Sequence, residues 1–405
     1  MKLDDTDSRA MKARTSWFFK PLGWLLAVIG VLCRILLLAW GSLAVYYSNL
    51  PWPGLRLVLA AAFLAFGIWA VWLSHWSQRY VAFAAVYAGV LVWWVTIRPS
   101  HDRPWRPEVA VLPRVTIDGD RVHITGVRNF KYRSQNDFDV RYEEREVLLS
   151  HLQTLDLFVS YWHDGPVAHT FVSFDFDNAP PVSISIETRP EVGEGFDPIA
   201  SLFKQFELIY LVGDERDLVG VRAVHRKEDV FLYRIRITPE NARQLFLIYL
   251  KRINEIADRA EWYHLLSNSC TINIIRYANR VGPSRGFDIR HFLNGFIDRY
   301  VYATGAIQTD LPFDELRRRS RINEAVKDAY DAPDFSDRIR AGLPTIHPTE
   351  RIFTPRQRAL LLMPLMSSGP TALVVTVPPL TADLRAEVPD TLTWRTRLPC
   401  FTHLS

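Results

Sequence analysis

The sequence predicts an α+β protein in which three N-terminal transmembrane helices precede a domain with an antiparallel sheet. Two observations support this prediction. Long apolar runs are concentrated in residues 1–98, and strand-like segments are dense between residues 108 and 235, before a helical pattern begins. The 405 residues leave room for two or three structural units. The net charge of +4 is small and dispersed, and no nucleic-acid partner is expected.

Three apolar segments form the predicted membrane region, residues 1–98. They cover about residues 22–47, 55–75 and 80–97. Each meets or approaches the length of about 17–25 residues with which a helix crosses a bilayer. No small-residue cleavage site follows the first segment, which argues against a signal peptide. Buried core helices are the alternative for the other two segments.

Charge bias predicts the orientation of these segments. Several basic residues precede the first one: Lys2, Arg9, Lys12, Arg14 and Lys20. Such residues hold an N-terminus in the cytoplasm, and an odd number of crossings then exports everything after Ile97. Arg34 lies inside the first segment, where a charge is costly. If the first segment were an interfacial helix, the topology would be inverted.

The exported part, residues 99–343, begins with a pattern typical of an antiparallel sheet. Val109–Ile117 and Arg121–Val127 flank the turn Asp118-Gly119-Asp120, which predicts a hairpin. Further strand-like segments are separated by Gly, Pro, Asp and Asn: Leu155–Ser160, Val167–Phe176, Val182–Glu187, Glu207–Val212, Leu218–Val224 and Val230–Ile237. The short connection 177–181 predicts that the strands on either side of it pair.

Helices are predicted from Thr238 onward. Thr238 is a suitable N-cap, and the helix that it starts has an apolar face out to about Ile256. A second helix is expected over residues 270–280 and a third over Asp288–Tyr302. Residues 344–405 are rich in proline and lack periodicity, so a poorly ordered tail is expected there.

Cys270 is the candidate nucleophile, because it lies where a loop turns into a helix. Ser267 or Asn268 can cap that helix. The helix dipole and free N–H groups of a first turn favour a thiolate, which lowers the pKa of a thiol there. His169, near the start of a predicted strand, is the candidate base. An inert buried cysteine with a core histidine, or a disulfide between Cys270 and Cys400, are the alternatives.

Short motifs follow one another through residues 100–343. They are Val127-Arg128-Asn129-Phe130, Tyr132-Arg133-Ser134, Ser160-Tyr161-Trp162, Ala168-His169-Thr170, Ser185-Ile186-Glu187-Thr188-Arg189, Asp214-Glu215-Arg216-Asp217, Tyr233-Arg234, Asn268-Ser269-Cys270-Thr271 and Leu311-Pro312-Phe313. In this order they resemble the Lnb N-terminal periplasmic domain, a bacterial family named after a lipoprotein transacylase. Ser269 is a departure, since family members tend to have asparagine directly before the cysteine.

The resemblance implies a permuted papain/NlpC–P60-like fold, in which the helix that begins at the cysteine packs on a sheet that carries the histidine. It matches Cys270 to the nucleophile and His169 to the base. Glu187 is the first choice for the residue that orients His169, with Ser185 and Asp175 as alternatives. Motif residues expected to contact the substrate are Trp162, Asn268 and Arg189.

The function implied by this resemblance is that of a cysteine acyltransferase or hydrolase in the periplasm, anchored in the bacterial inner membrane. A membrane lipid or a lipoprotein is the expected substrate, processed through a thioester. A peptidoglycan amidase or peptidase and a non-catalytic envelope scaffold are the alternatives. No cofactor and no metal are expected, because the sequence contains no phosphate-binding glycine loop and no recognised metal-ligand spacing.

Overall fold

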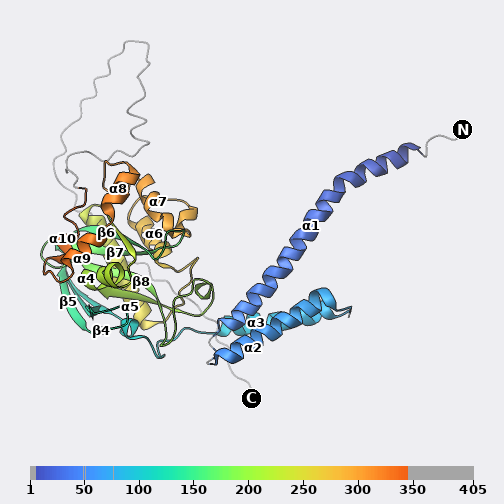
Figure 1. Cartoon of the computed structure of the whole chain (residues 1–405), viewed down its shortest axis with the longest axis horizontal. Helices are drawn as coiled ribbons and strands as arrows, with labels where there is room; N and C mark the ends of the chain where they lie inside the picture. The colour runs from blue at the N-terminus through green and yellow to red at the C-terminus, as the bar shows by residue number, and fades with distance from the viewer. Residues whose placement is uncertain (1–5, 49, 51, 76, 345–405) are drawn as a thin grey trace, which may run out of the picture. The chain divides into compact units, whose positions relative to one another are not determined.

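A computed structural model of the chain describes residues 6–48, 50, 52–75 and 77–344 (Figure 1). Its N-terminal region contains the helices α1 (Thr6–Tyr46), α2 (Pro53–Ile68), which continues as the π-helix η1 (Trp69–Leu73), and α3 (Arg79–Thr96). Three spans are long and apolar enough to cross a membrane, judged by length and composition: Leu22–Tyr46, Pro53–Leu73 and Arg79–Thr96. They overlap the three predicted segments. Cys400 and the predicted tail, except Pro344, lie outside the described residues.

The remainder of the described chain is an α+β domain built on an eight-stranded sheet, which confirms the predicted fold class. The strands are β1 (Arg114–Asp118), β2 (Arg121–Arg128), β5 (Tyr142–Leu148), β6 (Leu152–Tyr161), β7 (His169–Phe176), β8 (Val182–Arg189), β9 (Glu207–Gly213) and β10 (Asp229–Arg234). Their order is β1-β2-β9-β8-β7-β6-β10, with β5 paired to β2. Within this sheet β2 and β9 pair in parallel and the other pairs are antiparallel. A separate ribbon joins β3 (Lys131–Tyr132) and β4 (Phe138–Asp139).

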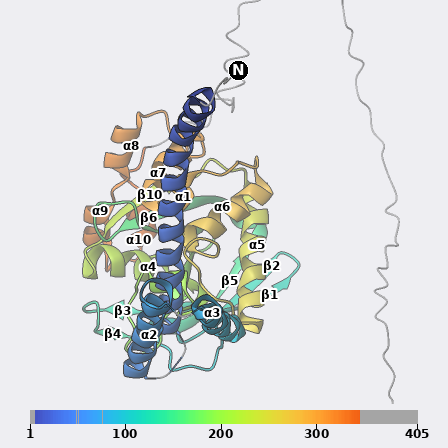
Figure 2. The ribbon, with the colours of Figure 1, turned by 90° about the vertical axis from the view of Figure 1, so that its right-hand side faces the viewer.

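Helices cover both faces of this sheet. On one face α5 (Pro239–Asp258) and α6 (Cys270–Val281) lie side by side, as Figure 2 shows, with α7 (Ile297–Ala303) beyond them. The other face carries α4 (Glu215–Gly220), the π-helix η5 (Val221–His225), α9 (Asn323–Ala329) and α10 (Phe335–Arg338). The helix α8 (Phe313–Ser320) contacts β10. Short 3-10 helices are η2 (Pro107–Val109), η3 (Leu149–His151), η4 (Ala200–Leu202), η6 (Ile289–His291) and η7 (Asn294–Phe296).

Residues of β7 alternate between these two faces. Val172 and Phe174 belong to the core under α5 and α6, whereas Phe171 belongs to the core under α4 and α9. This alternation follows from the period of two along a strand. A sheet buried on both faces explains why the strand-like segments are so apolar.

Two of the predicted strands differ from the structure. Leu218–Val224 is helical, formed by α4 and η5, because Asp214 accepts a hydrogen bond from the N–H of Arg216 and starts a helix there. Leu218, Val219 and Val221 are all fully buried, so most of this short apolar run has no exposed face that would reveal a helical period. The strand predicted at Val109–Ile117 begins only at Arg114, and β5 lies where no strand was predicted.

Strands β7 and β8 pair over only part of their length. β7 pairs with β8 between Phe171 and Phe174. Beyond this stretch β6 accompanies β7 as far as His169, while β9 accompanies β8 as far as Arg189. The two strands therefore part at this end of the sheet, and His169 lies at the opening.

The helix predicted over Asp288–Tyr302 is divided into η6, η7 and α7. Gly295 accounts for the break. Its N–H donates to the carbonyl oxygen of Pro166 over 2.9 Å, and a Cβ at this position would lie 2.1 Å from the carbonyl oxygen of Gly165. This close approach holds η7 against the loop 162–168, which leads into His169.

We expect Gly295→Ala to lower the free energy of unfolding by about 1–3 kcal/mol, because the added methyl group collides with backbone that cannot rotate away. Gly286→Ala is the matched control, since a Cβ there meets no atom within 4 Å. Thermal unfolding of both proteins in detergent measures the difference. Equal melting temperatures for the two variants would argue against the close approach.

Candidate active site

Cys270 is the first residue of α6 and is buried, with 2% of its surface exposed. Ser269 occupies the N-cap position and makes no side-chain cap hydrogen bond. The sequence-based choice of Ser267 or Asn268 as the cap is therefore wrong. Asn268 instead donates to the carbonyl oxygen of Trp262 over 3.0 Å and accepts from Asn273 over 3.0 Å, which fixes the turn before the cysteine. The uncapped first turn favours negative charge at the thiol.

The imidazole of His169 acts on the thiol of Cys270, and its effect is to lower the pKa of that thiol. Burial alone would raise the pKa of the thiol. The hydrogen bond and the charge of His169, together with hydrogen bonds to Thr170, more than offset burial and lower the pKa of Cys270 to about 6. A thiolate, which is the nucleophilic form of cysteine, is therefore populated at neutral pH.

Ser185 and Glu187 fix the other edge of the imidazole. The Nε2 atom of His169 lies 2.7 Å from Ser185 Oγ and 3.7 Å from Glu187 Oε1. The hydroxyl of Ser185 donates to Glu187 Oε1 over 2.6 Å, so Ser185 Oγ accepts from Nε2. Nδ1 is then the atom left for the thiol. Ser185 is the direct neighbour and Glu187 the next group in line, while Asp175 lies 3.5 Å from Arg234.

Arg222 anchors the carboxylate of Glu187. Its Nη2 donates to Glu187 Oε1 over 2.6 Å and its Nη1 donates to the carbonyl oxygen of Leu218 over 2.7 Å. Burial would raise the pKa of Glu187, but Arg222 and His169 hold it well below its usual range. Arg222 belongs to η5, and π-helices are frequent at functional sites. Sequence reasoning missed this residue because it interpreted the segment as a strand.

A buried ion pair holds the helix that precedes Arg222. The side chains of Arg128 and Asp217 are 4% and 0% exposed, and Nη2 and Oδ1 lie 2.7 Å apart. Asp217 also accepts from the N–H of Phe130 over 2.7 Å. The ion pair thus joins two sequence motifs, since Arg128 and Asp217 are 89 positions apart. Because a buried charge is stable only when it is paired, this contact fixes α4 and with it η5.

Asn294 joins the histidine strand to the cysteine helix through one buried amide. It accepts from the N–H of Ala168 over 2.9 Å and donates to the carbonyl oxygen of Ala168 over 2.6 Å. Its Nδ2 also lies 3.1 Å from Thr271 Oγ1 and 4.0 Å from Cys270 Sγ. The hydroxyls of Thr170 and Thr271, 2.9 Å apart, add a second link. Asn294 carried no sequence signal, because it lies inside the predicted third helix.

Trp162 and Arg189 have different surroundings. Trp162 is 38% exposed, and its ring stacks on Phe196 with centroids 5.4 Å apart. Arg189 is buried and donates to the carbonyl oxygens of Val109 and Ala110 over 2.9 and 2.7 Å. Its third nitrogen, Nη1, lies 3.2 Å from Nδ1 of His101. Arg189 is therefore surrounded by partners within the protein.

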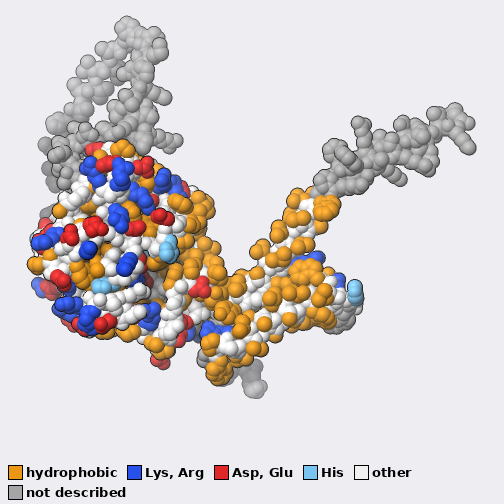
Figure 3. Space-filling view, viewed as in Figure 1, with side chains coloured by type: hydrophobic (Ala, Val, Ile, Leu, Met, Phe, Trp, Pro, Cys, Tyr) orange, Lys and Arg blue, Asp and Glu red, His pale blue; other side chains and the backbone are white. Residues whose placement is uncertain are grey.

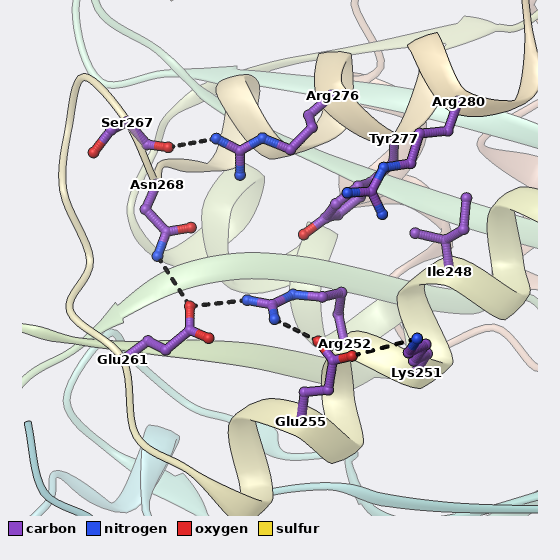
Figure 4. Close-up of a pocket in the computed structure, with 10 residues that line it drawn as sticks. All are labelled: Ile248, Lys251, Arg252, Glu255, Glu261, Ser267, Asn268, Arg276, Tyr277 and Arg280. Atoms are coloured by element: carbon purple, nitrogen blue, oxygen red, sulfur yellow. Dashed lines mark hydrogen bonds and ion pairs between the residues drawn. The ribbon is translucent and has the colours of Figure 1, made fainter. Parts of the chain in front are cut away.

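A cavity of about 750 Å³ lies between α5, α6 and the loop before Cys270 (Figure 4). Its lining includes Asn268 but neither Cys270 nor His169: Ile248, Lys251, Arg252, Glu255, Glu261, Ser267, Asn268, Arg276, Tyr277 and Arg280. Arg252 donates to Glu255 over 2.5 Å and to Glu261 over 2.9 Å. Asn268 therefore lies in a polar hollow that is separate from the thiol. Among the described residues, no three His, Cys, Asp or Glu side chains gather as a metal site.

The segment that contains this site matches a known family. Residues 138–295 match the family model of the Lnb N-terminal periplasmic domain. This segment is similar to that family. The resemblance expected from the motifs is thereby confirmed over a range that includes His169, Glu187, Cys270 and Asn294. No curated protein and no solved structure matches the chain. The permuted papain-like assignment stays a prediction.

The Lnb N-terminal domain and the apolar helices together support a membrane-anchored protein with a periplasmic domain. Within that domain, the described contacts bring Cys270, His169, Ser185 and Glu187 together. A thiolate beside an oriented imidazole is suited to acyl transfer.

Alkylation of Cys270 should report its lowered pKa. The thiolate forms as the pH rises through the pKa, so labelling by iodoacetamide should increase with a midpoint near pH 6, below the value of about 8.5 for a free thiol. In His169→Ala the group that lowers the pKa is gone and burial remains, so the midpoint should rise to about 8.5 or higher. Mass spectrometry of the Cys270 peptide measures both curves. Identical midpoints would exclude the contact with His169 as the cause.

Glu187→Gln should raise the labelling midpoint of Cys270, because it removes the carboxylate that holds Ser185 against the imidazole of His169, the group that lowers the pKa of Cys270. It also leaves Arg222 buried without a carboxylate, at a cost of about 3 kcal/mol in unfolding free energy. Asp177→Asn is the control, since Asp177 forms an exposed pair with His151 over 2.6 Å. Labelling curves and thermal melts of both variants give the comparison. If the labelling midpoint of Cys270 shifts as little in Glu187→Gln as in the control, Glu187 has no role in the site.

Proposed function

We propose that this chain is a periplasmic cysteine acyltransferase or hydrolase, held in the bacterial inner membrane by several spans. It remodels acyl groups of a lipoprotein or membrane lipid through a thioester. The observation that carries the proposal is the thiol of Cys270 at a helix start, whose pKa is lowered by His169. The match to the Lnb N-terminal periplasmic domain supports the compartment. The basic N-terminus before the first span supports the orientation.

The first half of the reaction forms the acyl-enzyme. The Cys270 thiolate attacks the carbonyl carbon of an ester, a C–S bond forms, and the carbonyl electron pair moves to oxygen. This oxyanion develops beside the uncapped first turn of α6, whose N–H groups and dipole stabilise negative charge. Collapse of the intermediate breaks the C–O bond. The His169 imidazolium gives its Nδ1 proton to the leaving alkoxide.

The second half transfers the acyl group. An amine or a water molecule attacks the thioester carbonyl and gives a proton to Nδ1 of His169. The C–S bond then breaks and restores the thiolate beside an imidazolium. Ser185 and Glu187 keep the Nε2 proton of the ring in place during both halves. Arg222 keeps Glu187 ionised and thereby supports the imidazolium.

The residues that hold this geometry have separate tasks. Asn294 fixes the backbone directly before His169 and the helix start at Thr271, so it sets the distance between base and nucleophile. Trp162, exposed beside Phe196, is available to contact an acyl chain. Asn268 positions the turn before Cys270.

The proposal predicts a product change that depends on Cys270. In cells that carry Cys270→Ala, the N-terminal lipopeptides of membrane lipoproteins, analysed by mass spectrometry, should lose the acylation pattern of the wild type. Cys33→Ala is the matched control, because Cys33 is the other free cysteine of the described residues and lies exposed on α1.

Two other outcomes would replace this proposal. Unchanged lipopeptides with altered muropeptides would identify a peptidoglycan amidase or peptidase. Unchanged lipopeptides, muropeptides and membrane lipids would leave a non-catalytic scaffold.

A further inference from the structure

We infer that the loops around Cys270 form an apolar rim that lies in the outer leaflet of the bilayer and admits acyl chains from the membrane to the site. The rim consists of six side chains that are 38–50% exposed: Trp162, Phe196, Ile199, Leu266, Leu293 and Phe296. The inference that the rim admits acyl chains rests on the proposed function. The inference that the rim lies in the outer leaflet does not rest on it, and a separate experiment tests each of them.

The four segments that carry the rim are in contact with one another. Trp162 stacks on Phe196 and so joins the loop 162–168 to the loop 190–206. The N–H of Leu265 donates to the carbonyl oxygen of Ser201 over 2.9 Å, which joins the turn before Cys270 to the same loop. Gly295 lies against Gly165 and Pro166, which joins η7 to the loop 162–168. The exposed side chains therefore belong to one continuous group of loops, which includes the turn before Cys270.

The loop 190–206 also contacts the ends of two membrane helices. Lys204 donates to the carbonyl oxygens of Trp94 and Val95 at the end of α3 and of Ile97 directly after it, over 2.9, 3.1 and 3.0 Å. A cation is favourable at a helix C-terminus. Phe203 stacks on Tyr47, the residue after α1, with centroids 5.7 Å apart. Because these helices end where the bilayer ends, the loop lies at the membrane interface.

Charged groups in this loop are turned to protein partners. Asp197 accepts from the hydroxyl of Tyr47 over 2.8 Å, and Glu191 pairs with Arg103 over 2.9 Å. Glu194 accepts a hydrogen bond from Gln205. The carboxylates that would oppose contact with acyl chains are thus occupied. Phe196, directly before Asp197, and Ile199, two residues after it, remain exposed.

The distribution of side chains over the domain agrees with this assignment. Figure 3 shows hydrophobic side chains gathered along one side of the domain, whereas charged side chains are dense over the rest of the visible face. Exposed aromatic and aliphatic side chains beside a membrane anchor are typical of surfaces that enter the headgroup region. Lipid is therefore the occupant that fits the rim, in preference to a second copy of the chain.

Spin labels test the position of the rim in the full chain. Labels are attached at Phe196→Cys and Phe296→Cys in a background of Cys33→Ala, Cys270→Ala and Cys400→Ala, in nanodiscs that hold one copy each. Val140→Cys is the control, since Val140 is an exposed apolar residue directly after β4. The rim labels should be more accessible to oxygen than to a water-soluble nickel chelate, and the control label should show the reverse. Nickel accessibility equal to that of the control would overturn the inference, as would protection that appears only with two copies per disc.

Activity measurements test what the rim admits. Phe196→Ser with Ile199→Ser should slow turnover of a diacylated lipopeptide in nanodiscs by at least about tenfold, since two buried apolar contacts with lipid are lost. Turnover of soluble p-nitrophenyl acetate should stay within about twofold of wild type, because the Cys–His site is untouched. Equal losses on both substrates would overturn membrane delivery. If the wild type processes neither substrate, the proposed function fails while the spin labels still decide the position of the rim.

Discussion

A buried charge must find a partner, and in this domain that requirement fixes the position of the imidazole. Arg222 is buried against Glu187, which holds Ser185, which in turn holds Nε2 of His169. Removing one partner from this series of hydrogen bonds would leave an uncompensated buried charge, at a cost of several kcal/mol. The positions of its members therefore depend on one another. The series reaches the imidazole because β7 and β8 part beyond Phe171, where the sheet no longer fills the space between them. Nδ1 is then left for Cys270 from the helix on the opposite face.

Two independent supports converge on this contact. On one face of the sheet, the pair of Arg128 and Asp217 fixes α4 and carries η5 with Arg222 to Glu187. On the other face, Asn294 binds both the backbone before His169 and the start of α6. The same segments extend outward as the apolar rim, and Lys204 ties one of them to the end of α3. A single set of loops thus connects the thiol to the membrane anchor.

The parts of this site that depend on local sequence patterns could be predicted. Cys270 at a helix start and His169 at the first residue of a strand follow from composition and period, and the hairpin at Gly119 follows from its turn. Leu218–Val224 was predicted wrongly, because a short and mostly buried apolar run has no distinctive period. The role of Asn294 could not be predicted from the sequence, for a different reason. Its role arises from the close approach of Gly295 to the loop 162–168, which is a property of the tertiary structure.

Cysteine chemistry at the centre of this account has one direct consequence, a covalent intermediate. The full chain in membranes supplied with acylated substrate, quenched rapidly in acid and digested, should yield a Cys270 peptide that carries the mass of an acyl group. Neutral hydroxylamine should release that group, and the modified peptide should be absent from His169→Ala. Consumption of substrate by the wild type with Cys270 unmodified at every quench time would contradict the account.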